Sequence, residues 1–223
     1  SRSLLYETAR YVDLYKALED IAKERQLTPD ERKEMKQYKK FADALTPLAK
    51  GLSSEYCNQN AYDCIQVHGG SGFMKDYACE RLYRDARITS IYEGTTQLQV
   101  VAAIRHVTTG TYLSLIQGYD AVEVDARLKP LKDSLRALTE QYTKAVEAVL
   151  AVGQQPYTDF MARRLVEMAG NIVMGYLLLL DAQRNADFDR TATIYNKMAQ
   201  AEVARHAQFI NNFSADQLDL YKA

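Results

Sequence analysis

The stretch TPDERKEMKQYKKFADALTPLAKGLSSEYCNQNAYDCI, residues 28–65, predicts one long helix. Thr28 suits the N-cap, Pro29 suits the first helical position, and Glu31 completes a capping box. Apolar residues then recur every three or four positions, which is the spacing of one helix face. They are Phe41, Leu45, Leu48, Leu52, Tyr56, Ala61 and Ile65. We expect any kink in this helix at Pro47.

Similar periodicity on both sides predicts a first helical unit over residues 1–110. Its other helices are expected at about 3–26, 76–88 and 95–107. The pattern breaks at the glycine-rich segment 68–73 and again at 89–95. Because the apolar pattern begins in the first turn with no start Met or leader before it, we expect the chain to be the C-terminal piece of a longer protein.

Residues 111–223 form a second predicted unit. Apolar stripes over 128–149, 161–186 and 194–209 predict three helices joined by short loops, which is typical of an antiparallel bundle. The stripes indicate core or interface rather than a binding site. No stretch argues for a strand longer than a few residues, so the fold class is all-α.

Composition excludes several function classes. The 223 residues carry 28 Lys+Arg against 29 Asp+Glu, so the basic excess of a nucleic-acid binder is absent. The longest apolar run, 172–180, is too short to span a bilayer and predicts a buried core helix. Cys57, Cys64 and Cys79 are too few for a disulfide framework, which favours reduced thiols in the cytoplasm or another reducing compartment, and we expect a cytoplasmic location. We expect Cys64 and Cys79 to be buried as small apolar side chains.

The chemistry is expected within residues 57–110. The glycine-rich segment lies between two helices, so on spacing alone it is typical of a helix C-terminus, although bare backbone also lets a ligand approach closely. Glu93 stands between Tyr92 and Gly94 at a helix–loop–helix corner. From the sequence alone it is an exposed loop glutamate or, if desolvated, a general base with a raised pKa. The charged run 80–87 is expected to be ion-paired. The histidines show no metal-ligand spacing, so no metal is predicted.

Three segments together resemble the C-terminal helical domain of the acyl-CoA dehydrogenases. They are QVHGGSGF (66–73), ERLYRDARI (80–88) and IYEGTTQLQ (91–99). The resemblance covers roughly residues 1–110. Residues 111–223 resemble, in architecture and length, an extra C-terminal helical region of a longer bacterial branch of that family.

The resemblance implies an FAD-dependent enzyme that dehydrogenates an acyl-CoA thioester between its α- and β-carbons, in fatty acid metabolism. Glu93 would take the α-proton while hydride passes to flavin N5. The family's flavin-contacting positions correspond to Gln66, Val67, His68, Gly69, Gly70, Thr95 and Gln97. Gly94 and Arg105 correspond to substrate-side positions. The implied partners are acyl-CoA, an electron-transfer flavoprotein as acceptor, and further copies of the chain in a homo-oligomer, with no nucleic acid and no membrane span.

Two other functions remain open. The chain could be a catalytically idle helical interaction module, or part of a related flavoprotein such as an acyl-CoA oxidase or a nitroalkane oxidase. An intact Glu93 and glycine-rich segment argue against the idle module. The sequence does not reveal the oxygen reactivity that would distinguish an oxidase.

Overall fold

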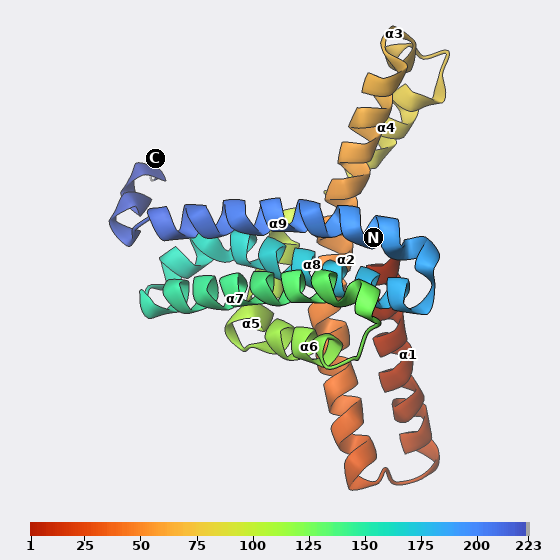
Figure 1. Cartoon of the computed structure of the whole chain (residues 1–223), viewed down its shortest axis with the longest axis vertical. Helices are drawn as coiled ribbons and strands as arrows, with labels where there is room; N and C mark the ends of the chain where they lie inside the picture. Colours follow the sequence, from red (N-terminus) through yellow and green to blue (C-terminus); the bar gives the residue numbers. More distant parts are fainter. Residues whose placement is uncertain (222–223) are drawn as a thin grey trace.

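The computed structural model describes residues 1–221, and every regular element in them is a helix (Figure 1). The first unit holds α1 (Arg2–Glu24), α2 (Pro29–His68), α3 (Gly70–Phe73), α4 (Ala78–Ile88) and α5 (Thr96–Thr108). The second holds α6 (Thr111–Asp120), α7 (Lys129–Ala151), α8 (Gln155–Arg184) and α9 (Asp189–Asn212). Short 3-10 helices are η1 (Ala126–Leu128), η2 (Ala186–Phe188) and η3 (Ala215–Tyr221). The all-α prediction is confirmed.

Helix α2 begins where the sequence predicts and runs through Pro47 for 40 residues. Both halves of the capping box are present. The Glu31 N–H donates to Thr28 Oγ1 at 3.2 Å, and the Thr28 N–H donates to a Glu31 carboxylate oxygen at 2.8 Å. Helix α1 lies along the N-terminal half of α2, and α4 lies along its C-terminal half (Figure 1). Each end of α2 therefore forms a helical hairpin.

Two elements differ from the sequence expectation. The glycine-rich break contains one helical turn, α3, and residues 111–120 form α6, which was not predicted. Helix α6 follows Gly110, whose φ of +68° turns the chain sharply after α5.

Helix α8 is the centre of the molecule. It lies against α7 and α9, as predicted for a three-helix bundle, and also against α5, α6 and α1. By length and composition α8 could cross a membrane. However, 78% of its most apolar 18-residue stretch is buried inside the protein, in agreement with the predicted core helix. Glycine permits its close approach to α2, since a Cβ at Gly170 would lie 2.3 Å from Leu52 Cδ1.

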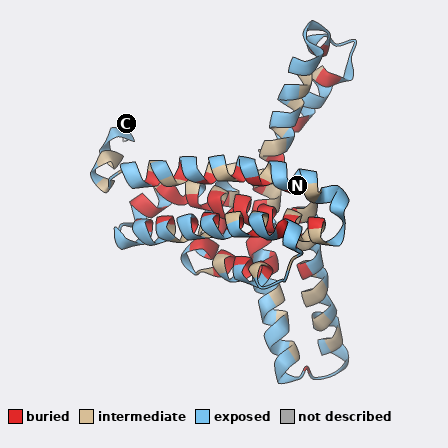
Figure 2. Cartoon of the chain, in the orientation of Figure 1, coloured by how far each residue is buried: buried red, intermediate tan, exposed pale blue. Residues whose placement is uncertain are grey.

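One continuous core joins the two predicted units. Buried side chains of α2 and α5 belong to the same apolar cluster as those of α6, α7, α8 and α9. The shared core marks no boundary between residues 110 and 111, so the division into two units there stays a prediction. Both hairpins project from this core and are coloured mostly as exposed in Figure 2. The outer hairpin of α2, α3 and α4 carries the glycine-rich segment, and its base carries the corner with Glu93.

Candidate functional site

Glu93 occupies a strained turn between α4 and α5. Its φ of +52° makes it the one non-glycine residue with positive φ within residues 1–221, and Gly94 follows at +92°. Such a conformation costs an L-residue on the order of 1 kcal/mol and persists where the surroundings enforce it, commonly at functional sites. The side chain of Glu93 is exposed, so residues 1–221 alone do not desolvate it.

Two side chains from different helices hold the backbone of this corner. Gln99 of α5 donates its amide to the carbonyl oxygens of Glu93 at 3.2 Å and Gly94 at 3.4 Å. Lys50 of α2 donates to the same Gly94 carbonyl oxygen. Neither contact involves the Glu93 carboxylate, which therefore stays available to a ligand. Sequence analysis did not identify Lys50 or Gln99 as site residues.

The N-terminus of α5 offers less to an anion than the sequence suggests. Thr95 is the N-cap, and its hydroxyl accepts from the Leu98 N–H at 3.3 Å. The Thr96 N–H donates to the Ser90 carbonyl at 3.2 Å, and the Thr96 hydroxyl donates to Glu55 at 2.6 Å. In the first turn only the Gln97 N–H has no acceptor in the described part of the chain. Thr95 and Gln97 are both exposed beside Glu93.

Arg105 lies further along α5, about 15 Å from Thr95 by helical rise. It is exposed, and its Nε donates to His106 Nε2 at 3.1 Å. Burial, together with the charge of Arg105, lowers the pKa of His106. Arg105 therefore shares the helix of the Glu93 corner but does not contact that corner.

The glycine-rich segment forms the exposed tip of the outer hairpin. Gln66, Val67 and His68 end α2, and Gly69 turns the chain with a φ of +59°. These residues and Gly70 are exposed, Val67 to 84%. Gly72 is buried instead, and the chain packs so closely there that a Cβ would lie 2.7 Å from the Ile65 carbonyl oxygen.

The two groups of predicted site residues are separated in one copy of the chain. Glu55 of α2 contacts Thr96 next to the corner, while Gln66 lies 11 residues later. At the rise of an α-helix this is about 16 Å. The tip and the corner of one chain are therefore too far apart to surround the same small group closely.

The predicted ion pairing of the charged run 80–87 is wrong for the described residues. Arg81, Arg84 and Asp85 are exposed and form no ion pair there, and Arg87 bonds to Ser90. These charged side chains are therefore on the surface of the described part of the chain.

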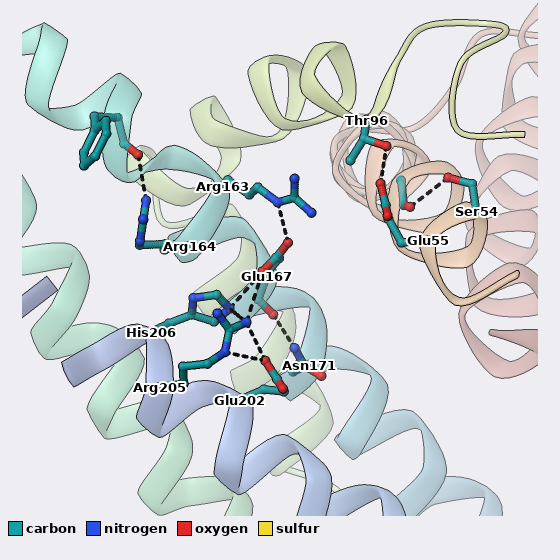
Figure 3. A network of polar contacts seen from close by, with 12 residues as sticks. Ser54, Glu55, Thr96, Arg163, Arg164, Glu167, Asn171, Glu202, Arg205 and His206 are labelled. Atoms are coloured by element: carbon teal, nitrogen blue, oxygen red, sulfur yellow. Dashed lines mark hydrogen bonds and ion pairs between the residues drawn. The ribbon is translucent and has the colours of Figure 1, made fainter. Parts of the chain in front are cut away.

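A polar network that the sequence did not predict lies away from the corner and the tip. Figure 3 shows Glu167 of α8 between Arg163 and His206, at 2.7 and 2.8 Å. Burial opposes ionisation of Glu167, but the bonds to His206 and Arg163 outweigh it and lower its pKa to about 2. Arg205 adds a bond to Glu202 at 2.6 Å. This network fastens α9 to α8 rather than forming an open site.

One further grouping was missed. Cys64, His68 and Cys79 come together near the tip, with Cys79 buried as predicted and Cys64 only partly buried. Their spacing matches no familiar metal motif, and a turn separates Cys79 from the other two. Only the folded loop reveals this cluster.

Comparison with known proteins identifies the origin of the fold. The family described as "Acyl-CoA dehydrogenase, C-terminal domain" matches residues 17–108, and "Acyl-CoA dehydrogenase C terminal" matches residues 108–218. A broad-specificity linear acyl-CoA dehydrogenase of Mycobacterium tuberculosis is 31% identical over 155 residues, which is 62% of this chain and 25% of that protein. An acyl-CoA dehydrogenase of Bacillus subtilis is 44% identical over 64 residues, 29% of this chain and 17% of that one.

Other relatives carry different names. A subunit of the caffeyl-CoA reductase–Etf complex of Acetobacterium woodii is 48% identical over 61 residues, 27% of this chain and 16% of its own length. The chain thus spans between a sixth and a quarter of these relatives. An acyl-CoA dehydrogenase of Bacillus anthracis, solved with FAD, superposes on 98% of the chain and 42% of its own, with a TM-score of 0.68 and 19% identity, which shows a shared fold. The two matched families adjoin at residue 108 and together run from 17 to 218, so the chain belongs to the acyl-CoA dehydrogenase family and carries its C-terminal helical regions.

Proposed function

We propose that this chain is the C-terminal helical part of an FAD-dependent acyl-CoA dehydrogenase, with Glu93 as the catalytic base. The observation that carries the proposal is the strained backbone of Glu93, held by Lys50 and Gln99 while its carboxylate remains unpartnered and exposed. An ordinary surface glutamate has no need of positive φ. The fold is consistent with this assignment, since the superposed dehydrogenase was solved with FAD.

Glu93 would take the proton from the α-carbon of the thioester. This proton is weakly acidic, so the negative charge that develops on the thioester oxygen needs a hydrogen-bond donor at the same time. The Glu93 N–H suits this role, because it has no acceptor in the described part of the chain. One residue would then supply both the base and a donor. Bound FAD supplies the acceptor for the hydrogen that leaves the β-carbon.

The residues near the corner fit the edge of a cofactor site. The free Gln97 N–H and the positive end of the α5 dipole favour an anionic group such as a phosphate. Gly94 keeps the backbone next to Glu93 bare, and we propose that it and Arg105 face the acyl-CoA. Water would be excluded by other parts of the enzyme, since the corner itself is open.

We further propose that two copies of the chain share each cofactor. The tip residues Gln66 to Gly70 lie too far from Glu93 to act in the same site of one chain, so they would reach the site of a neighbouring copy. Exposed apolar side chains support such an assembly. On α5, Leu98 is 57% exposed and Val101 is 58% exposed, while Val67 and Phe73 project from the tip. Burying such side chains favours association.

An electron-transfer flavoprotein is the proposed electron acceptor, in a cytoplasmic enzyme. The support for the acceptor is a relative whose name places it in a complex with Etf. The three cysteines are free, which agrees with a reducing compartment.

An anaerobic titration of the flavin-loaded enzyme that contains this chain tests the proposed function. Acyl-CoAs of increasing length are added, and the flavin absorbance is followed before and after air is admitted. Bleaching by an acyl-CoA, with slow recovery in air, is the expected result. Rapid recovery with formation of hydrogen peroxide would indicate an oxidase, and no bleaching by any acyl-CoA would favour the idle module.

A further inference from the structure

The cysteine–histidine cluster near the tip has the composition of a site for a soft metal ion. The sulfur atoms of Cys64 and Cys79 lie 3.4 Å apart, and His68 Nδ1 lies 3.9 Å from Cys64 Sγ. All three potential ligand atoms are within 4.8 Å of one another. Thiolates and imidazole together are the ligands that Zn²⁺ prefers in proteins.

Local structure explains why these three side chains meet. Cys64 and His68 are four residues apart on α2, so they lie on the same face of its last turns. Cys79 is the second residue of α4, which returns beside α2. Gly72 makes this return possible, since a Cβ there would lie 2.8 Å from His68 Cβ.

We propose that Cys64, His68 and Cys79 bind one Zn²⁺ ion per chain, with the fourth position open to water. The distances agree with this geometry. Tetrahedral zinc with Zn–S of ≈ 2.3 Å and Zn–N of ≈ 2.0 Å places two sulfurs roughly 3.8 Å apart and a sulfur and a nitrogen roughly 3.5 Å apart. The observed separations around Cys64, 3.4 and 3.9 Å, differ from these by a few tenths of an ångström. Binding would therefore move the two sulfurs slightly apart and bring the imidazole slightly closer to Cys64 Sγ.

Metal binding replaces two existing contacts, the one between the sulfurs of Cys64 and Cys79 and the one between His68 and the Cys64 carbonyl oxygen. His68 Nδ1 lies 2.8 Å from the Cys64 carbonyl oxygen, so the ring must move its proton to Nε2 before Nδ1 can coordinate. The ring is exposed and free to do so. A bound dication displaces the protons of the thiols that coordinate it. Zinc uptake should therefore release protons.

The imidazole distinguishes a metal site from a redox pair of cysteines. A disulfide would use the two sulfurs and leave His68 without a function in the cluster. In the structure the sulfurs are in non-bonded contact, and the third ligand atom stands beside them. A metal would use all three side chains and join α2 to α4 across the turn that contains Gly69 and Gly70. His68 also belongs to the segment proposed to reach the flavin of a neighbouring copy, so a bound metal would in addition fix the position of that segment.

A cobalt titration of the intact enzyme tests the site. The protein is treated with a chelator, reduced with a phosphine, and titrated with Co²⁺ and then Zn²⁺. We expect one Co²⁺ per chain with a thiolate-to-cobalt charge-transfer band and the intense visible bands of tetrahedral cobalt, both lost on addition of one Zn²⁺. Weak octahedral-type spectra, or no saturable binding, would overturn the proposal without reference to any variant.

Substitutions assign the ligands. Cys64→Ser and Cys79→Ser should each weaken Zn²⁺ binding on the order of hundredfold, because a thiolate ligand is lost. His68→Gln should also weaken it, by at least about tenfold. Cys57→Ser is the matched control, since Cys57 is an exposed free cysteine on the same helix outside the cluster. Far-ultraviolet circular dichroism checks that each variant is folded. Unchanged affinity in folded Cys79→Ser would contradict the assignment.

Discussion

Replacing Glu167 by Gln should weaken the polar contacts that join α8 to α9 and so lower the stability of the fold. The carboxylate accepts bonds from His206 and Arg163, and only 21% of its side chain is exposed. Its pKa is lowered from 4.5 to about 2. A difference of roughly 2.5 pKa units corresponds to about 3 kcal/mol of stability at pH 7. The amide keeps the shape but loses the charge, so we expect Glu167→Gln to reduce the free energy of unfolding by about this amount.

The same pKa gives the pH dependence of this effect. A carboxylate whose pKa is lower in the folded than in the unfolded protein stabilises the fold fully above pH about 5, and this stabilisation is lost as the pH falls toward 2. The difference between wild type and Glu167→Gln should therefore narrow to about 1.4 kcal/mol at pH 3. Protonation makes the wild-type side chain neutral, as the amide already is.

Urea-induced unfolding followed by circular dichroism measures both values, at pH 7 and pH 3. Glu202→Gln is the matched control, because Glu202 is 46% exposed and pairs with Arg205 on the same helix, which contributes roughly 0.5 kcal/mol or less. Equal effects of Glu167→Gln and Glu202→Gln at pH 7 would refute this reasoning. A difference that stays constant from pH 7 to pH 3 would do so as well.

Three further predictions concern the corner and the assembly. Gly94→Ala should destabilise the protein by about 1–3 kcal/mol, because φ is +92° and the new Cβ would lie 2.8 Å from Gln99 Nε2. Gly70→Ala is the control and should be nearly neutral, since a Cβ there would meet no atom within 4 Å. Equal denaturation midpoints of the two variants would contradict this. The 223-residue chain by itself should bind little FAD and not turn over acyl-CoA, because the Glu93 corner is open; a yellow purified chain with stoichiometric flavin would disprove it. By light scattering it should be dimeric or larger, since apolar side chains of α5 and the tip are exposed; a monomer at micromolar concentration would count against this.

The sequence predicted those features that local chemistry determines. The start of α2 follows from Thr28, Pro29 and Glu31, which act within four residues of one another. The apolar residues of α8 are more numerous than one exposed face allows, which predicted a buried core helix. By contrast, α6 was not predicted although its apolar residues Tyr112, Leu115, Ile116 and Tyr119 have the spacing of one helix face, because the helix is short and has no side-chain N-cap bond.

The parts of the site that could not be predicted depend on how distant elements meet. Lys50 and Gln99 hold the Glu93 corner only because α2 and α5 pack in one particular register. The strained φ of Glu93 and the meeting of Cys64 with Cys79 are likewise consequences of folding. The sequence marked Glu93 as a candidate base by its position at the corner, and the resemblance to a family favoured that role. The strained backbone is a separate, physical argument for the same proposal.

The rate of flavin reduction in Glu93→Gln tests the central claim most directly. The flavin-loaded enzyme is mixed with its acyl-CoA in a stopped-flow instrument without oxygen, and Glu147→Gln, at an exposed position on α7, is the matched control. A glutamine cannot accept the α-proton, so reduction should slow by at least the 10²–10⁴-fold typical of a lost general base while flavin content and ligand binding stay near wild type. Glu147→Gln should reduce at the wild-type rate. If Glu93→Gln keeps more than about a tenth of the wild-type rate, which is well above that range, the base is another residue and the account of this corner is wrong.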